Sequence, residues 1–185
     1  MSLEYAILGF LNYHPYTGYD LKKIFDSSVR HFWSADQSQI YRTLSRLTDQ
    51  GYVEMEKVPQ EARPDRKVYH ITDTGRRNFM DWLAGPPAME DPRSSSLVQV
   101  FFAGKLSDEE ILEKFEGFAG VMRALLAHYA EVPAIISPYQ QEIQSPREHF
   151  FWMLPLENGI ANMRTNLEWA EKVIERIRNH ELPQG

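Results

Sequence analysis

Two short segments in the first half of the chain, residues 52–58 and 67–72, are rich in β-branched and aromatic residues. Runs of this kind are typical of β-strands, and the charged stretch between them, residues 59–66, predicts a hairpin with a long tip. Elsewhere the apolar residues recur at spacings of three and four, which indicates helices. The pattern therefore predicts a mainly α-helical chain with one α+β part built around a hairpin.

Three helices are expected before the hairpin and one after it. The first covers residues 3–11, and Thr17 is suited to cap the second. The third covers about residues 36–50, carries an apolar stripe, and ends at Gly51. Thr72 is suited to cap the fourth helix. The order helix, helix, helix, strand, strand, helix is that of a winged helix, which is a helix-turn-helix with an attached β-hairpin.

A break between two domains is expected at Gly85-Pro86-Pro87, where a glycine can end a helix and two prolines cannot continue it. A polar stretch follows the prolines. We therefore expect a winged-helix domain over residues 1–86, a linker over residues 87–96, and a helical C-terminal dimerisation domain over residues 97–185.

The second half carries two apolar seams with the alternating spacing of a heptad. A capping box at Ser107 and Glu110 opens the first helix, which is expected to end in the proline-rich segment 132–138. Pro155 is expected to kink or break the chain before the second helix. Two such seams in one small domain require partners to pack against.

Charge is distributed unevenly between the two halves. The net charge of −6 taken over the whole chain counts against a nucleic-acid partner, since phosphate binding needs a basic surface. Residues 1–86, however, carry 11 Lys and Arg against 11 Asp and Glu, whereas residues 87–185 carry 9 against 15. The acidic excess therefore lies in the second half, and the first half remains a candidate for binding DNA.

Several classes of protein are excluded or disfavoured. The chain has no cysteine, which excludes disulfide scaffolds, zinc ribbons and cysteine nucleophiles and fits a cytoplasmic location. No signal peptide and no membrane-spanning run are recognisable. The common nucleotide-binding, metalloprotease and hydrolase motifs are missing, and the six histidines form no i, i+4 pair. We therefore expect no enzyme activity, metal or cofactor. A site assembled from residues far apart in the sequence is the one kind that a search for short motifs does not detect.

The third expected helix presents polar side chains away from its apolar stripe: Ser38, Gln39, Arg42, Thr43 and Arg46. Arginine can bind guanine and glutamine can bind adenine, while hydroxyl groups reach phosphates. On an arbitrary helix such a face is usually only solvated. Here the helix directly precedes a hairpin, which favours a role in reading the DNA major groove.

The expected hairpin offers Arg63, Arg66 and Lys67 against two acidic residues, a net charge of only +1. Taken alone, this tip is equally consistent with a soluble turn. Beside a recognition helix, these cations become candidates for contacts with the DNA backbone or minor groove.

A second kind of site is suggested by aromatic residues, namely Trp33, Tyr129, His149 and Trp152. Filling a core or a dimer seam is the commoner role of such side chains. His149 and Trp152 nevertheless lie on one helical face near Pro155, and a pocket for a small aromatic effector at these four residues is our hypothesis.

Ordered motifs across residues 3–83 resemble the PadR family of bacterial transcriptional regulators. They are Tyr16-Thr17-Gly18-Tyr19-Asp20-Leu21, Trp33, Ser38-Gln39-Ile40-Tyr41-Arg42-Thr43-Leu44-Ser45-Arg46-Leu47, Gly51-Tyr52-Val53, Arg63-Pro64-Asp65-Arg66-Lys67-Val68-Tyr69-His70-Ile71-Thr72-Asp73-Thr74-Gly75, and Trp82-Leu83. The second half is similar to the AphA-like helical C-terminal domain of the longer PadR-like proteins, through Phe101-Phe102-Ala103-Gly104, the Ser107 cap, and Gly159-Ile160 leading to Trp169.

The resemblance implies a homodimer with a winged helix on each subunit, bound to a palindromic operator in double-stranded DNA. Many members repress, some respond to aromatic compounds, and the AphA kind activates. It also implies DNA contacts from Ser38, Gln39, Tyr41 and Arg42 on the recognition helix and from Arg63, Arg66 and Lys67 on the wing.

The sequence therefore predicts a sequence-specific DNA-binding transcriptional regulator, a repressor that acts as a homodimer on an inverted repeat and responds to a small aromatic effector. Two alternatives stay open at this point. One is a winged helix that binds only protein, consistent with the neutral first half. The other is a small-molecule-binding or catalytic helical protein without DNA specificity.

Overall fold

The computed structural model describes residues 2–30, 32–59, 65–87, 94–181 and 183, and of residues 135–142 the backbone alone. The chain divides into two compact units. Met1–Ala88 is the main part of the first, and Met89–Ala134 with Ser145–Gly185 forms the second. Each unit is described by itself.

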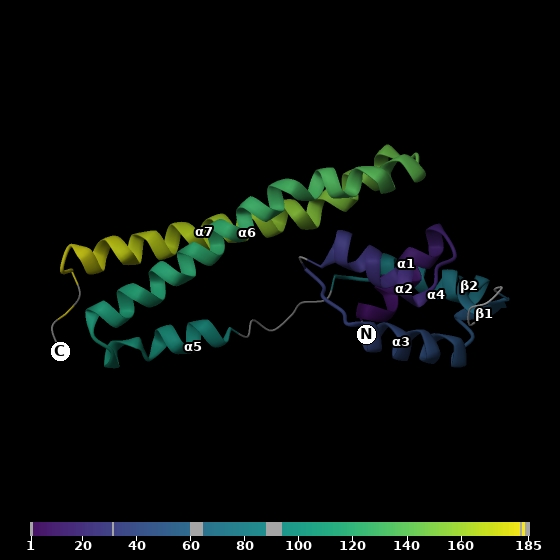
Figure 1. Ribbon diagram of the computed structural model, residues 1–185, viewed down its shortest axis with the longest axis horizontal. Coiled ribbons are helices and arrows are strands. Elements are labelled where there is room, and N and C mark those ends of the chain that lie inside the picture. Colours follow the sequence, from purple (N-terminus) through teal and green to yellow (C-terminus); the bar gives the residue numbers. More distant parts are fainter. Residues whose placement is uncertain (1, 31, 60–64, 88–93, 182, 184–185) are drawn as a thin grey trace. The chain divides into compact units, whose positions relative to one another are not determined.

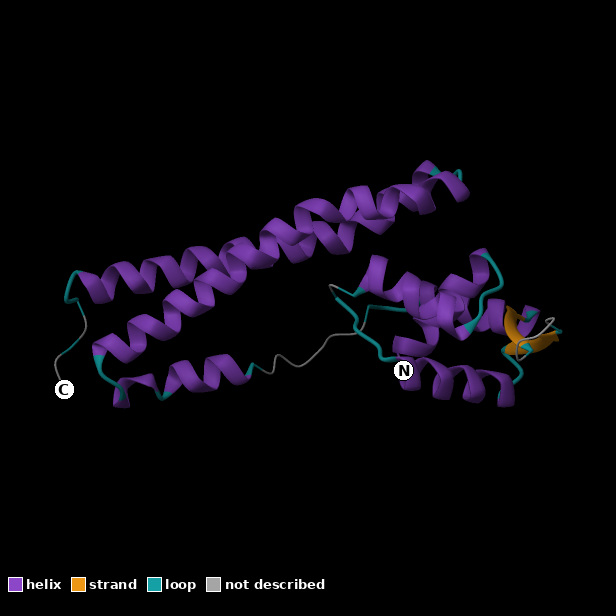
Figure 2. Ribbon diagram, viewed as in Figure 1, coloured by secondary structure: helices purple, strands orange, loops and turns teal. Residues whose placement is uncertain are grey.

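The first unit has the element order expected for a winged helix (Figures 1 and 2). Its elements are α1 (Ser2–Tyr13), α2 (Gly18–Ile24), the π-helical turn η1 (Phe25–Val29), α3 (Gln37–Asp49), β1 (Val53–Val58), β2 (Arg66–Ile71) and α4 (Asp73–Ala84). The expected helix and strand boundaries are met within about two residues, which is the ordinary scatter of helix ends. This unit confirms the predicted fold class.

Side-chain caps fix where the helices of this unit begin. The Thr17 hydroxyl accepts a hydrogen bond from the backbone N–H of Asp20 at 3.1 Å and caps α2. The Thr72 hydroxyl caps α4 in the same way through the N–H of Gly75 at 3.0 Å. At α3 the cap is reciprocal, because Asp36 and Gln39 exchange hydrogen bonds of 2.7 and 2.9 Å. Each cap satisfies backbone donors that the first turn of a helix leaves unpaired.

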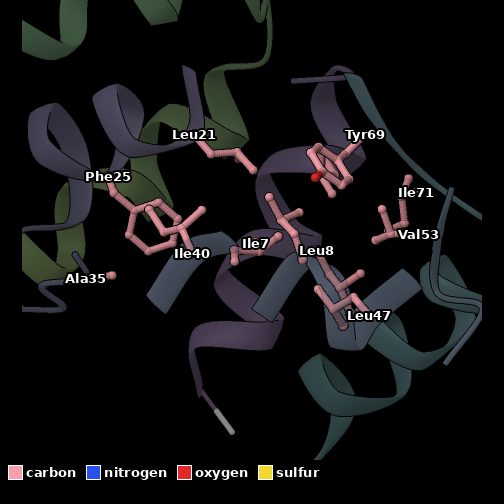
Figure 3. Close-up of a cluster of buried hydrophobic side chains, with 12 residues drawn as sticks. Ile7, Leu8, Leu21, Phe25, Ala35, Ile40, Leu47, Val53, Tyr69 and Ile71 are labelled. Atoms are coloured by element: carbon pink, nitrogen blue, oxygen red, sulfur yellow. The ribbon is translucent and has the colours of Figure 1, made fainter. Parts of the chain in front are cut away.

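The core of the first unit forms where α1, α2, α3 and the hairpin meet (Figure 3). Ile40, Leu44 and Leu47 of α3 are almost completely buried, as are Ile7 and Leu8 of α1. Full burial of an aliphatic side chain contributes roughly 1.5–3 kcal/mol. The stripe expected from the sequence therefore holds α3 against α1 and leaves the opposite face of α3 outside.

One residue of α3 differs from its expected position. Thr43 was expected on the outward or flanking face, but its side chain is 5% exposed. Position 43 follows Ile40 by three residues and precedes Leu47 by four, so it falls on the buried stripe of a 3.6-residue helix. Thr43 is therefore part of the packing of α3.

The hairpin is antiparallel, with Val53 opposite Ile71 and Val58 opposite Arg66. Tyr16, directly before α2, pairs with Tyr69 of β2 through two backbone hydrogen bonds of 3.2 and 2.9 Å. This bridge joins β2 to the segment that leads into α2.

The second unit is helical. It contains α5 (Ser95–Phe101), the 3-10 turn η2 (Ala103–Lys105), α6 (Asp108–Glu142) as far as Ala134, and α7 (Pro146–Arg178) (Figure 1). The expected capping box is present: Ser107 N–H donates to Glu110 Oε2 at 2.8 Å, and Glu110 N–H donates to Ser107 Oγ at 3.2 Å. Among the described residues, no helix combines the length and apolar character needed to cross a membrane.

The core of the second unit consists of Ile111, Phe115, Ala119, Ala170, Ile174 and Ile177. All of them except Ala119 come from the two predicted heptad seams. Ion pairs of 2.6 Å between α6 and α7, Arg123 with Glu171 and Arg178 with Glu116, flank them. Because residues later in α6 pair with residues earlier in α7, the two helices run antiparallel.

The break expected in segment 132–138 is wrong, and of the kink or break expected at Pro155 the break is wrong. The chain stays helical through segment 132–138 within α6, and α7 passes through Pro155 without interruption. A proline removes one backbone hydrogen bond and crowds one carbonyl, which is a local cost. The burial of Val132 and Leu156 beside these prolines, together with the packing of the two long seams, outweighs that cost.

A test of the packing between α4 and the hairpin is available at Gly75. A Cβ at this position would lie 2.2 Å from the backbone oxygen of Tyr52 and 3.0 Å from Ile71 Cγ1. Gly75→Ala must therefore push α4 away, and we expect it to lower the free energy of unfolding by about 3 kcal/mol, as overpacking does. Urea denaturation followed by circular dichroism measures this.

Gly117→Ala is the matched control, because a Cβ at Gly117 in α6 would meet nothing within 4 Å. We expect this variant to be more stable than the wild type by about 0.5–1 kcal/mol, since alanine favours a helix over glycine. Equal effects of the two substitutions would contradict the proposed packing.

Candidate nucleic-acid interface

The outer face of α3 collects the polar residues predicted for DNA contact. Ser38, Gln39, Tyr41, Arg42 and Arg46 are all exposed, while the opposite stripe is buried. The structure thus brings these five predicted residues together on one solvent-facing surface of a single helix. The cause is the burial of the stripe, which fixes the rotation of α3 about its own axis.

The two arginines of α3 differ in their surroundings. Arg46 Nε lies 2.6 Å from Glu4 Oε1 of α1, and the Glu4 side chain is only 15% exposed. Arg46 is thereby anchored to α1. Arg42 makes no ion pair with any residue that the structure describes, so its guanidinium is available to a ligand.

Gln39 is partly engaged by the cap of α3. Its side-chain carbonyl accepts the backbone N–H of Asp36 at 2.9 Å. Bidentate binding of adenine needs both the carbonyl and the amide of a glutamine. Within the capping box, the amide NH₂ of Gln39 and the second lone pair of its carbonyl oxygen remain for a base.

The Tyr41 ring lies over the first residue of α2. A Cβ on Gly18 would come within 2.5 Å of Tyr41 Cε1, so the close approach requires glycine. Burial raises the pKa of the Tyr69 hydroxyl, and the neighbouring Tyr41 raises that pKa further. Tyr41 is therefore placed between α2 and the hairpin, with 40% of its surface exposed.

The wing supplies cations at the start of β2. Arg66 and Lys67 are both exposed, and Lys67 lies opposite Lys57 in the strand register of the hairpin. Lys57 was missed by sequence reasoning, because its position opposite Lys67 follows only from the strand register. Arg63, the third predicted wing residue, lies outside the described residues.

Arg66 is held by an acidic residue of α2. Its Nη2 atom donates to Asp20 Oδ2 at 2.8 Å, and the Thr17 hydroxyl donates to the same oxygen at 2.7 Å. Burial raises the pKa of Asp20, but the hydrogen bond from Thr17 and the hydrogen bond and charge of Arg66 outweigh it and lower the pKa below its usual value. Asp20 is therefore an anion at neutral pH, paired with the wing.

The four residues of the expected effector pocket do not form one cluster within a single unit. Trp33 packs against the core of the first unit. Tyr129 is buried on α6, and the His149 and Trp152 rings lie 5.2 Å apart on α7. A separate hollow of about 570 Å³ lies between α5, α6 and α7, lined by Phe115, Phe118 and Trp169 among others, and none of the four residues lines it. Across the described part of the chain, no group of three or more acidic or histidine side chains could hold a metal ion.

Both halves of the chain match known protein families. Residues 7–81 match the model of the transcriptional regulator PadR-like family, and residues 92–178 match the virulence activator alpha C-terminal model. The chain is 29% identical to the negative transcriptional regulator PadR of Bacillus subtilis, covering 95% of this chain and 97% of that protein. It is 30% identical to the probable transcriptional regulator Rv1176c of Mycobacterium tuberculosis, covering 96% of this chain and 98% of the relative.

Solved structures agree with these matches. Bacillus subtilis PadR in complex with operator DNA superposes with a TM-score of 0.79 at 28% identity, covering 96% of this chain and 99% of that one. The Vibrio cholerae virulence activator AphA superposes with a TM-score of 0.73 at 25% identity, with the same coverage. The family consists of transcriptional regulators and not of enzymes, which confirms the prediction that the protein has no enzyme activity. With both halves matched and relatives aligned over nearly the whole length, this chain belongs to the PadR-like family of transcriptional regulators.

Proposed function

We propose that the protein is a sequence-specific DNA-binding repressor of the cytoplasm that acts as a homodimer on an inverted-repeat operator. The proposal rests on the outer face of α3, where a row of exposed polar side chains lies opposite the buried stripe. The wing, with Arg66 and Lys67, directly follows this helix in the chain. The related Bacillus subtilis PadR, a negative regulator crystallised with operator DNA, supports both the DNA partner and the repressor role.

Within this proposal each residue has a role set by its chemistry. Arg42 and Gln39 read base edges in the major groove. Ser38 and Tyr41 bind phosphates and set the register on the duplex. The wing residues Arg63, Arg66 and Lys67 add backbone contacts. Glu4 holds the Nε atom of Arg46, which leaves the other N–H donors of this guanidinium for a DNA contact.

The helical domain, residues 97–185, supplies the dimer contact in this proposal, with residues 87–96 as the linker from the winged helix. Its exposed apolar surface supports this role: Phe101 is 80% exposed, and Val98, Phe102 and Phe150 are each more than half exposed. Val98, Phe101 and Phe102 lie close together at α5, with the rings of Phe101 and Phe102 5.0 Å apart, and neighbouring exposed apolar side chains of this kind are typical of an interaction site. Two-fold symmetry would then set two α3 helices in successive major grooves about 34 Å apart.

An aromatic effector is the second part of the proposal. It is supported by the ring contact between His149 and Trp152 on α7 and by a related structure, Bacillus subtilis PadR in complex with p-coumaric acid. We expect p-coumaric acid to raise the melting temperature of the wild type and to weaken its DNA binding. Trp152→Ala should lose both effects. A thermal-shift screen in which no planar aromatic compound stabilises the wild type would contradict this part.

The test of the DNA-binding proposal compares binding to the DNA upstream of the protein's own gene with binding to unrelated DNA of equal length. Arg42→Ala should cost about 1–3 kcal/mol on the specific site and relax its specificity, since a base contact discriminates among sequences. Titrations by fluorescence anisotropy measure both quantities.

Arg76→Ala is the matched control, because it removes the same charge from an arginine that is bonded to Asn12 Oδ1 at 2.6 Å instead. It should leave the specificity unchanged. Equal weakening of Arg42→Ala on every sequence would assign Arg42 to a phosphate, and no loss at all would contradict its role.

A further inference from the structure

We propose that Asp20 is a positioning residue that holds Arg66 ready to contact DNA, through a link of three side chains, Thr17, Asp20 and Arg66, which we call the wing clamp. The inference rests on the proposed DNA-binding function and adds to it an acidic residue that makes no contact with DNA itself. Asp20 Oδ2 is the centre of the link, because it accepts hydrogen bonds from both Thr17 Oγ1 and Arg66 Nη2.

Besides the clamp, a backbone bridge joins β2 to the segment that leads into α2. This bridge links Tyr16 and Tyr69. Arg66 lies three residues before Tyr69 on β2, and Asp20 lies four residues after Tyr16. One attachment fixes the position of β2, and the second, nearer the wing tip, fixes its direction and the orientation of the Arg66 side chain.

The geometry of the clamp suits positioning better than stability. The side chains of Asp20 and Arg66 are 33% and 51% exposed. Ion pairs at this exposure contribute little to stability, because solvent screens them. Thr17, by contrast, is buried, and the hydrogen bond from its hydroxyl fixes the orientation of the Asp20 carboxylate. A fixed carboxylate orders the arginine that binds it.

Ordering Arg66 in advance aids DNA binding for two reasons. A guanidinium has five N–H donors, so one bond to Asp20 leaves the others for a phosphate. A long side chain that is already ordered loses less conformational entropy when the complex forms. The clamp therefore turns an acidic residue, which alone would repel DNA, into one that favours the complex.

Asp20→Asn separates positioning from simple charge. The substitution removes a negative charge, so electrostatics alone predicts tighter binding to DNA. The clamp predicts the opposite, a weakening of about three- to ten-fold, because a neutral amide holds Arg66 less firmly than a carboxylate does. Asp65→Asn is the control: it makes the same charge change beside Arg66, and Asp65 is exposed and forms no ion pair with the described residues. It should leave affinity equal or higher. Affinity of Asp20→Asn at or above the wild-type level would overturn the proposal.

A double-mutant cycle with Arg66→Ala tests whether Asp20 acts through Arg66. In the Arg66→Ala background, Asp20→Asn should no longer weaken binding, since there is no arginine to order. A loss equal to that in the wild type would overturn the proposal and assign the effect to α2 itself.

A measurement without DNA separates this proposal from the proposed function. In the free protein, the Arg66 guanidinium NMR signals should show restricted rotation, and Asp20→Asn should remove that restriction. Freely rotating Arg66 in the wild type would overturn the clamp while leaving the DNA-binding proposal intact. Absence of specific DNA binding by the wild type would instead overturn the proposed function, and the role of the clamp with it.

Discussion

The packing of the α3 stripe against α1 is the contact on which the remaining features of the first unit depend. Ile40, Leu44 and Leu47 are almost completely buried, and they pack against Ile7 and Leu8, which are equally buried. Because a helix with one stripe buried has its opposite face fixed, this contact alone decides that Arg42 faces outward. It also brings Glu4 to Arg46, so that the Nε atom of Arg46 is held by α1. Hydrophobic burial thus decides which side chains of α3 face a ligand.

Around that contact, small polar and steric details set the positions of the other side chains. Gly18 has no Cβ, so Tyr41 can lie against the start of α2. The hydroxyl oxygen of Thr17 caps α2, and the same hydroxyl donates a hydrogen bond to Asp20, which in turn holds Arg66. One turn of one short helix therefore connects the recognition helix with the wing. The surface offered to DNA is preorganised by neighbours that carry little positive charge of their own.

Much of this architecture could be predicted from the sequence because it is local. The caps at Thr17, Thr72 and Ser107 depend on residues three positions apart, and the α3 face depends on one helical period. The predicted break in segment 132–138 was wrong, and α7 does not break at Pro155, because a proline acts locally, whereas the two heptad seams and the ion pairs between α6 and α7 act along both helices. The pairing of Lys57 with Lys67 and the anchoring of Arg46 could not be predicted, since they depend on strand register and on contacts between distant elements.

The central claim, that the exposed row of α3 and the wing bind phosphates and bases, is tested most directly by measuring the affinity of the wild type for its own upstream DNA across a series of salt concentrations. The account predicts specific binding whose log K falls linearly as log salt rises, because each phosphate contact releases counterions. Unrelated DNA should bind far more weakly at the same salt. Binding that does not change with salt, or no binding even at low salt, would contradict the account and favour a winged helix that recognises protein.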